Sequence, residues 1–185
     1  MSTFRLKLMH AEAAKRLSDA ELLIEADPLG SRRYDSDHLL KLLGVELLLK
    51  FVFEVEVGKE ANSYGHDYPS LFCDLPTQTQ DRIIELCGKR IGPSEFSSKN
   101  LQILKEWSRN FVALRYPFER YKNMTEEQYR ATSARWLQKG AKLESATFRF
   151  YPSELKGILY ALQMIANLHA RAHFGEEFVH DIFCA

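Results

Sequence analysis

Several features that are common in exported proteins are scarce or missing in this sequence. Its three cysteines, Cys73, Cys87 and Cys184, are odd in number and form no Cys-x-x-Cys pair. This usage argues against a disulfide framework and suits a reducing cytoplasm. No uninterrupted apolar run reaches the roughly 18 residues that span a bilayer, and charges throughout the first residues exclude a signal-like start. We therefore expect a cytoplasmic protein with no membrane segment.

The chain also lacks a surplus of either charge and has little glycine or proline. Lys plus Arg and Asp plus Glu number 25 each, so no global field draws the protein toward nucleic acid or an anionic membrane. Only nine glycines and six prolines, beside 45% hydrophobic residues, indicate a folded globular chain. Because no repeat or interdomain linker is found, we predict one domain over residues 1–185.

Motifs of the common enzyme classes are absent as well. The sequence contains no phosphate-binding GxxxxGK[ST] loop, no GxGxxG after a strand, no HExxH and no GxSxG. His169 and His173 are four residues apart on an expected helix, a spacing that can place both on one metal. Two imidazoles do not complete such a site, and His180 is a third ligand only if the tail folds back. We expect no metal and no cofactor.

Hydrophobic periodicity instead predicts an all-α protein, an antiparallel bundle of five or six helices. Apolar residues recur at three- and four-residue steps from Leu6 to Ile24, in a first helix that ends near Asp27. A second helix is apolar nearly all round over residues 39–53, so it should be central. Its charged residues Glu46, Lys50 and Glu54 are four apart and can pair along one stripe.

Polar residues mark where three helices should begin. Ser36 or Asp37 can cap the second helix. Two pairs have the spacing of a capping box, which opens helices after Thr77 and Thr125: Thr77 with Gln80, and Thr125 with Gln128. The first of these helices should end at residues 87–88 and the second at residues 139–140.

The carboxyl-terminal half should contain a long helix and a last amphipathic helix. From residue 98 to residue 121 the apolar residues are close to a heptad stripe, which predicts packing along the whole length, although Pro117 can kink or shorten the helix. The run at residues 146–151 is strand-like without an obvious partner. Pro152 is well placed in the first turn of the last helix.

Three segments together resemble the HEPN superfamily of helical-bundle domains. They are DHLLKLLGVELLLKFVFEVEVG, YGHDYPSLF and WSRNFVALRYPFERY, within residues 37–121. The resemblance implies a homodimer, and in many members a metal-independent ribonuclease in which an Arg and a polar residue are followed by a His. Arg109-Asn110 matches the start of that motif, but Leu114, Arg115 and Tyr116 occupy the positions of the His. Arginine cannot move a proton near neutral pH, so we expect no ordinary HEPN nuclease activity.

Basic and aromatic residues near this motif are the candidate ligand-binding residues. On one continuous helix, Arg109, Tyr116 and Arg120 would lie within about 40° of one another, with Lys105 beside them. Guanidinium groups bind phosphate and a ring stacks on a base, so nucleotide or RNA contact is possible, through Asn110 and Arg115 as well. A solvated face or the polar seam of a homodimer is the structural alternative.

His66-Asp67 is a second candidate. A His beside an Asp in a glycine-containing loop can act as a general base, or the Asp can simply cap the next segment. The stretch from Arg120 to Arg149 contains seven basic residues and three acidic ones. This local excess of positive charge can attract nucleic acid or an acidic partner.

The sequence therefore favours a non-catalytic, HEPN-like binding protein, a homodimer as the resemblance implies, with a protein or RNA as its partner. One alternative is a ribonuclease of a toxin-antitoxin or phage-defence system, using Arg109, Asn110 and Tyr116 with His66 as proton carrier. The other is an immunity or antitoxin protein whose surface fits one toxin.

Overall fold

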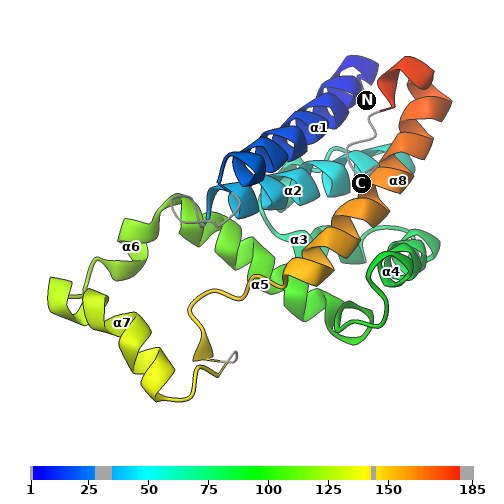
Figure 1. Cartoon of the computed structure of the whole chain (residues 1–185). Coiled ribbons are helices and arrows are strands. Elements are labelled where there is room, and N and C mark those ends of the chain that lie inside the picture. Colours follow the sequence, from blue (N-terminus) through cyan, green and yellow to red (C-terminus); the bar gives the residue numbers. More distant parts are fainter. Residues whose placement is uncertain (1, 28–34, 143–144, 180–185) are drawn as a thin grey trace.

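The computed structural model describes residues 2–27, 35–142 and 145–179, and every regular element in these ranges is a helix (Figure 1). The elements are α1 (Thr3–Ala26), α2 (Ser36–Val57), η1 (Asn62–Tyr64), α3 (Tyr68–Cys73), α4 (Thr77–Ile91), α5 (Phe96–Arg115), α6 (Pro117–Tyr121), α7 (Glu126–Gln138), α8 (Pro152–Phe174) and η3 (Glu176–Phe178). The predicted all-α class is confirmed. The six expected helices are present, and the two short helices α3 and α6 raise the number above the predicted five or six.

The central helix of the bundle is α2, which packs against α1, α3, α5 and α8. Its buried side chains point to all sides of the helix, as its sequence predicts; the apolar ones are Leu42, Val45, Leu48, Leu49, Phe51, Val52 and Phe53. A helix surrounded by neighbours needs no polar face, so burial explains the nearly continuous apolar run. None of the helices in the described ranges is both long and apolar enough to cross a bilayer.

Helices α1 and α2 approach each other closely at Gly44. A Cβ atom at this position would lie only 2.5 Å from Cδ2 of Leu17, which is itself buried. Glycine here lets the two helix backbones come together, at the cost in helix propensity that a glycine brings to a helix interior. The contact fixes the register of α1 along α2.

The charged stripe of α2 is only partly paired within the helix. Lys50 Nζ lies 2.7 Å from Glu46 Oε1, as predicted. Glu54 bonds with another helix instead, because both Nε and Nη2 of Arg5 in α1 donate to its carboxylate. Glu54 is fully buried, so this bidentate pair joins α1 to the core of the bundle.

Of two predicted helix caps, the one on α7 is present and the one on α2 is not. The helix α2 begins at Ser36, directly after Asp35, and no side chain caps it. The helix α7 has the predicted capping box, since Thr125 Oγ1 accepts from the Gln128 amide at 3.2 Å and Gln128 Oε1 accepts from the Thr125 amide at 2.9 Å. The cap predicted at Ser36 or Asp37 was wrong.

The capping box predicted for α4 was also wrong. No side chain caps this helix, and the Gln80 side chain turns back to the preceding loop. Its Nε2 donates to the backbone oxygens of Cys73 and Leu75, at 3.1 and 2.9 Å. These bonds turn the Gln80 amide group toward the loop, and Pro76 rather than Thr77 is the N-cap residue of α4, so no capping box forms. The helix also runs beyond residues 87–88 and ends at Ile91.

The long helix predicted over residues 98–121 is broken. The helix α5 ends at Arg115, Tyr116 leaves the helical region with φ −132° and ψ 59°, and α6 begins at Pro117. A residue before proline is disfavoured in the helical region, which explains the break. Packing along the whole length was therefore wrong: the buried stripe ends at Leu114, and Phe118 is 65% exposed.

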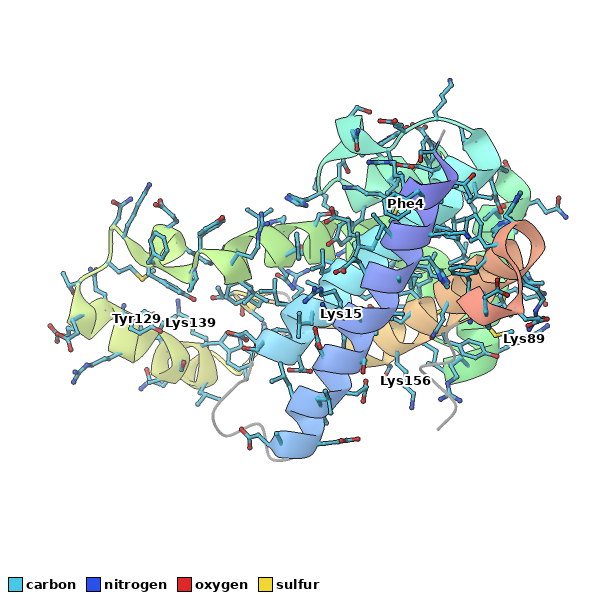
Figure 2. All side chains as sticks on the ribbon, turned by 90° about the horizontal axis from the view of Figure 1, so that it is seen from above. Phe4, Lys15, Lys89, Tyr129, Lys139 and Lys156 are labelled. Carbon is cyan, nitrogen blue, oxygen red and sulfur yellow. The ribbon has the colours of Figure 1, made fainter. Side chains whose placement is uncertain are left out.

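Beyond this break the chain forms an arm, residues 117–142, that extends away from the bundle (Figure 1). Figure 2 shows the same separation from above, with Tyr129 and Lys139 on the arm and Lys15 and Lys156 on the bundle. No residue of α7 is buried. The arm thus presents a large surface to solvent or to a partner.

The strand-like run at residues 146–151 returns from the arm as an extended segment without a partner strand among the described residues. Two side chains of α5 hold its backbone instead. Asn110 Nδ2 donates to the Arg149 carbonyl at 2.8 Å, and Trp107 Nε1 donates to the Phe150 carbonyl at 3.0 Å. Pro152 then occupies the first turn of α8, as predicted.

Candidate functional site

An open hollow of about 480 Å³ lies where α5, α6 and the start of α3 meet, and we call it the basic hollow. Its lining residues are His66, Asp67, Pro69, Lys105, Ser108, Arg109, Val112, Ala113 and Arg120. Three of these are cationic and one is a carboxylate, so the hollow carries a positive excess. Such a surface attracts anions at short range even in a chain with no net charge.

The backbone explains why the three cations meet. Lys105 and Arg109 are one helical turn apart on α5, so their side chains share a face. Arg120 lies on α6, after the break at Tyr116, and the change of direction still places it at the same hollow. The prediction from one continuous helix was wrong in its premise, yet Arg109, Arg120 and Lys105 do come together.

The guanidinium of Arg109 is available to an incoming anion. Its only partner among the described residues is Glu106, whose two carboxylate oxygens both lie 3.4 Å from Nη1. The Arg109 side chain is 59% exposed, and an exposed pair of this kind contributes little free energy. A phosphate oxygen can therefore replace Glu106 at small cost.

His66 is held at the rim of the basic hollow from three sides. Its Nδ1 lies 2.8 Å from Glu46 Oε2, its Nε2 lies 3.3 Å from Nη2 of Arg115, and its ring packs edge-on against Phe111. Arginine can only donate, so Nε2 accepts and the ring proton sits on Nδ1, where it is donated to Glu46. Both nitrogens of the imidazole are thus engaged.

The partner carboxylate Glu46 is itself buried and paired. It is 5% exposed and bonds both Lys50 and His66. Burial, with a smaller contribution from Glu46, raises the pKa of the Tyr68 hydroxyl well above its ordinary value. This phenol stays protonated and donates to the Leu42 carbonyl at 3.1 Å.

Asp67 has the structural role that the sequence offered as the alternative to catalysis. It is the N-cap of α3, where its carboxylate accepts from the Ser70 amide at 3.2 Å and from the Ser70 hydroxyl at 2.7 Å. Its neighbour His66 bonds Glu46 rather than Asp67. The predicted His-Asp pair is therefore replaced by a His66–Glu46 pair.

The remaining candidate residues lie outside the basic hollow. Asn110 is 2% exposed and its amide holds the Arg149 carbonyl, so it supports the fold. Arg115 stacks on Phe111, with its guanidinium carbon 4.7 Å from the ring centroid, and Tyr116 is half exposed beside it. Both can contact a ligand at the rim without lining the hollow.

No group of three or more His, Cys, Asp or Glu side chains in the described part of the chain is arranged to hold a metal ion. His169 Nε2 lies 2.8 Å from Glu56 Oε1, so this nitrogen is engaged in a hydrogen bond, and His180 lies outside the described residues. Cys73 is exposed and Cys87 is buried, both as free thiols, while Cys184 also lies outside the described residues.

Sequence reasoning missed the contacts that depend on tertiary structure. Glu46 was assigned to a charged stripe, and nothing in its spacing indicates that it meets His66, which is 20 residues away. Arg115 was placed among ligand-binding residues, and its contact with His66 spans 49 residues. Only coupled substitutions at these positions in related chains could have revealed either pair.

Comparison with family models, with curated proteins and with solved structures found no match to this chain. The resemblance to the HEPN superfamily, and the homodimer that it implies, therefore stay predictions.

Proposed function

We propose that this protein binds RNA without cleaving it, and that the phosphates of the RNA occupy the basic hollow. The observation that carries the proposal is the meeting of Lys105, Arg109 and Arg120 around one open hollow. Guanidinium groups match phosphate geometry, and the exposed Arg109 has only a weak partner to lose. The half-exposed ring of Tyr116, next to Arg115 and so near the lining residue His66, favours RNA over an acidic protein, because bases stack on rings.

The state of His66 explains the absence of cleavage in this proposal. Attack by a 2′-hydroxyl requires a group that accepts its proton. The lone pair of the imidazole is on Nε2 and faces the Arg115 guanidinium. The proton of the imidazole is on Nδ1, which donates it to Glu46. While both contacts hold, His66 has no free position for proton transfer.

We expect the purified chain to bind a labelled single-stranded RNA of about ten nucleotides with strong salt dependence. Three cations that each neutralise a phosphate predict a slope near −2 for log K against log salt, at about −0.7 for each contact. Arg109→Ala or Arg120→Ala should weaken binding by a factor of about 10 to about 100, since a charged hydrogen bond contributes about 1.5–3 kcal/mol. Fluorescence anisotropy between about 50 and about 200 mM salt measures both quantities.

The chain offers a matched control in Arg82→Ala. Like Arg109, Arg82 is an exposed arginine paired with a glutamate three residues away on its own helix. It lies on α4 and does not line the basic hollow. Equal losses of affinity in Arg82→Ala and Arg109→Ala would show that binding is a diffuse charge effect and would refute the proposed site.

A second candidate function is RNA cleavage, and the His66–Glu46 pair is the observation that favours it. A carboxylate that orients an imidazole is a usual arrangement for a general base. A bound phosphate that draws Arg115 away would release the Nε2 lone pair toward the RNA.

The two functions differ in the fate of the bound RNA. We expect the RNA to stay intact through hours of incubation without metal, as judged by gel electrophoresis. Cleavage that disappears in His66→Gln, and that a 2′-deoxy substrate resists, would establish the second candidate in place of the first. Cleavage that His66→Gln leaves unchanged would point to a contaminating nuclease.

A further inference from the structure

A second and larger hollow, of about 870 Å³, lies at the base of the arm, and we call it the aromatic hollow. Its lining residues are Glu95, Tyr121, Thr132, Ser133, Trp136, Ala146, Thr147, Phe148, Arg149, Phe150, Tyr151, Pro152 and Glu154. Five of them are aromatic, and none is shared with the basic hollow. The volume is in the range of about 300–1,000 Å³ that is usual for sites of small organic ligands.

Two parts of the chain form opposite walls of the aromatic hollow. One wall comes from α7, through Thr132, Ser133 and Trp136. The other comes from the extended segment 146–151, which Trp107 and Asn110 hold in place by hydrogen bonds to its backbone. These bonds stiffen the segment, which has no partner strand in the described part of the chain. Its rings form a surface on which a flat molecule can stack.

The two hollows lie on either side of one side chain, that of Arg120. Arg120 lines the basic hollow, and its guanidinium carbon is 5.2 Å from the ring centroid of Phe148, which lines the aromatic hollow. Its Nη2 also lies 3.5 Å from the Thr147 carbonyl. A ligand that places an anion against Arg120 therefore has its adjoining part next to the aromatic rings.

We infer that the aromatic hollow binds one unpaired nucleobase of an RNA strand whose neighbouring phosphate contacts Arg120 in the basic hollow. This inference rests on the proposed RNA binding and adds that the RNA is single-stranded. A base within a duplex is stacked and paired on both sides, so it cannot enter a hollow of this kind, whereas an unpaired base can stack on aromatic rings. The charge around the site agrees, with seven basic and three acidic residues from Arg120 to Arg149.

The polar groups of the aromatic hollow also select among bases. Glu154 forms no ion pair within the described residues, and Glu95, the N-cap residue of α5, pairs with the exposed Lys99 in the first turn of that helix. Carboxylates accept hydrogen bonds, and the exocyclic amino groups of adenine, cytosine and guanine donate them. Uracil has no amino group. We therefore expect the site to prefer an amino-bearing base.

Tryptophan fluorescence offers a direct test, because the chain has only two tryptophans. Trp107 is fully buried in the core, whereas Trp136 lines the aromatic hollow. Single-stranded oligo(A) should quench the emission of the wild-type chain, and a duplex of matched length should not. In Trp136→Phe the quenching should disappear while anisotropy still reports binding, because phenylalanine retains a ring for stacking.

Affinities of a small variant set complete the experiment. Trp136→Ala should bind single-stranded RNA about tenfold more weakly, the order of one lost stacking contact, and should bind the duplex unchanged. The matched control is Leu137→Ala, an exposed apolar residue next to Trp136 on the same helix that does not line the aromatic hollow. Its affinity for single-stranded RNA should equal that of the wild type. Circular dichroism checks that each variant is folded.

The possible failures are distinguishable. Salt-dependent RNA binding that is equal for single strand and duplex, and that Trp136→Ala leaves unchanged, would overturn the base site and leave the basic hollow standing. Quenching that persists in Trp136→Phe would likewise overturn it, since the signal would come from Trp107. If no RNA binds in a salt-dependent way, the proposed function fails and the base site fails with it.

Discussion

Arg5→Ala should lower the free energy of unfolding by about 3 kcal/mol, the lower end of the cost of removing one partner from a buried ion pair, because Glu54 is buried while the Arg5 side chain is 36% exposed. Glu54 has no exposed surface, and its carboxylate bonds Arg5 Nε at 3.1 Å, Arg5 Nη2 at 2.8 Å and the Ala61 amide at 3.0 Å. After the substitution only the amide remains of these contacts. The charge would then be buried without a cation, a state that proteins tolerate poorly.

Urea unfolding followed by circular dichroism measures this loss, and α1 provides a matched control. Arg16→Ala removes an arginine from the same helix whose partners, Glu12 and Asp19, are both solvent-exposed. Arg16→Ala should lower the free energy of unfolding by less than about 1 kcal/mol. The double variant with Glu54→Gln should recover part of the stability, since a neutral amide costs less to bury. Equal losses for Arg5→Ala and Arg16→Ala would contradict the assigned role of Glu54.

The buried core of this fold is readable from its sequence to a large extent. The periodic apolar residues of α1 and the all-round apolar run of α2 predict an amphipathic helix beside a central one, as found. These predictions succeed because burial repeats with the helical period and leaves a regular trace. Gly44 leaves no such trace, although it determines how closely α1 approaches α2.

Helix starts were less predictable, because the residue that becomes the N-cap and the bonds of its side-chain neighbours depend on the preceding loop. Thr77-Gln80 and Thr125-Gln128 have the same spacing, yet only the second pair forms a capping box. Thr125 is the N-cap residue of α7 and Gln128 Oε1 accepts from its amide, whereas Pro76 is the N-cap residue of α4 and the Gln80 amide group donates to two carbonyls of the preceding loop. Spacing alone does not contain that information.

The candidate site was predictable in its charge but not in its geometry. Arg109 and Lys105 share a face of α5 that any helical wheel shows. Arg120 lines the same hollow even though the helix breaks before Pro117, and the partner of His66 depends on the packing of α2 against α3. The aromatic hollow had no counterpart in the sequence, since its walls are brought together by the return of the chain from the arm.

The chain should lose stability in mild acid because of His38. This imidazole is 6% exposed, lies edge-on to Phe150 with ring centroids 4.6 Å apart, and its Nε2 has no hydrogen-bond partner in the described part of the chain. Burial lowers the pKa of His38 to about 4, opposed by the nearby Asp37 and reinforced by Lys41. The folded chain therefore resists a proton that the unfolded chain accepts.

The sign of the effect follows from proton binding. Between pH about 6.5 and pH about 4 the unfolded state holds more protons at His38, so the free energy of unfolding falls as the pH falls. The contribution of neutral His38 to the free energy of unfolding is fully present above the pKa that His38 has in the unfolded state. About 2 kcal/mol of this contribution should be lost between about pH 7 and about pH 5. The total loss, about 3 kcal/mol, should be reached below pH about 4, where the folded state also binds the proton.

His38→Phe isolates this contribution from those of the other histidines. Phenylalanine fills a similar volume and does not titrate, so the variant should lose about 2 kcal/mol less than the wild type between about pH 7 and about pH 5, as measured by urea unfolding at each pH. Parallel profiles for the two chains would show that His38 is not protonated on unfolding in this range.

Protonation of His38 should also affect the aromatic hollow. Since Phe150 both packs on His38 and lines the aromatic hollow, protonation of His38 should loosen that wall first. Quenching of Trp136 by oligo(A) should then weaken in acid in the wild type and much less in His38→Phe.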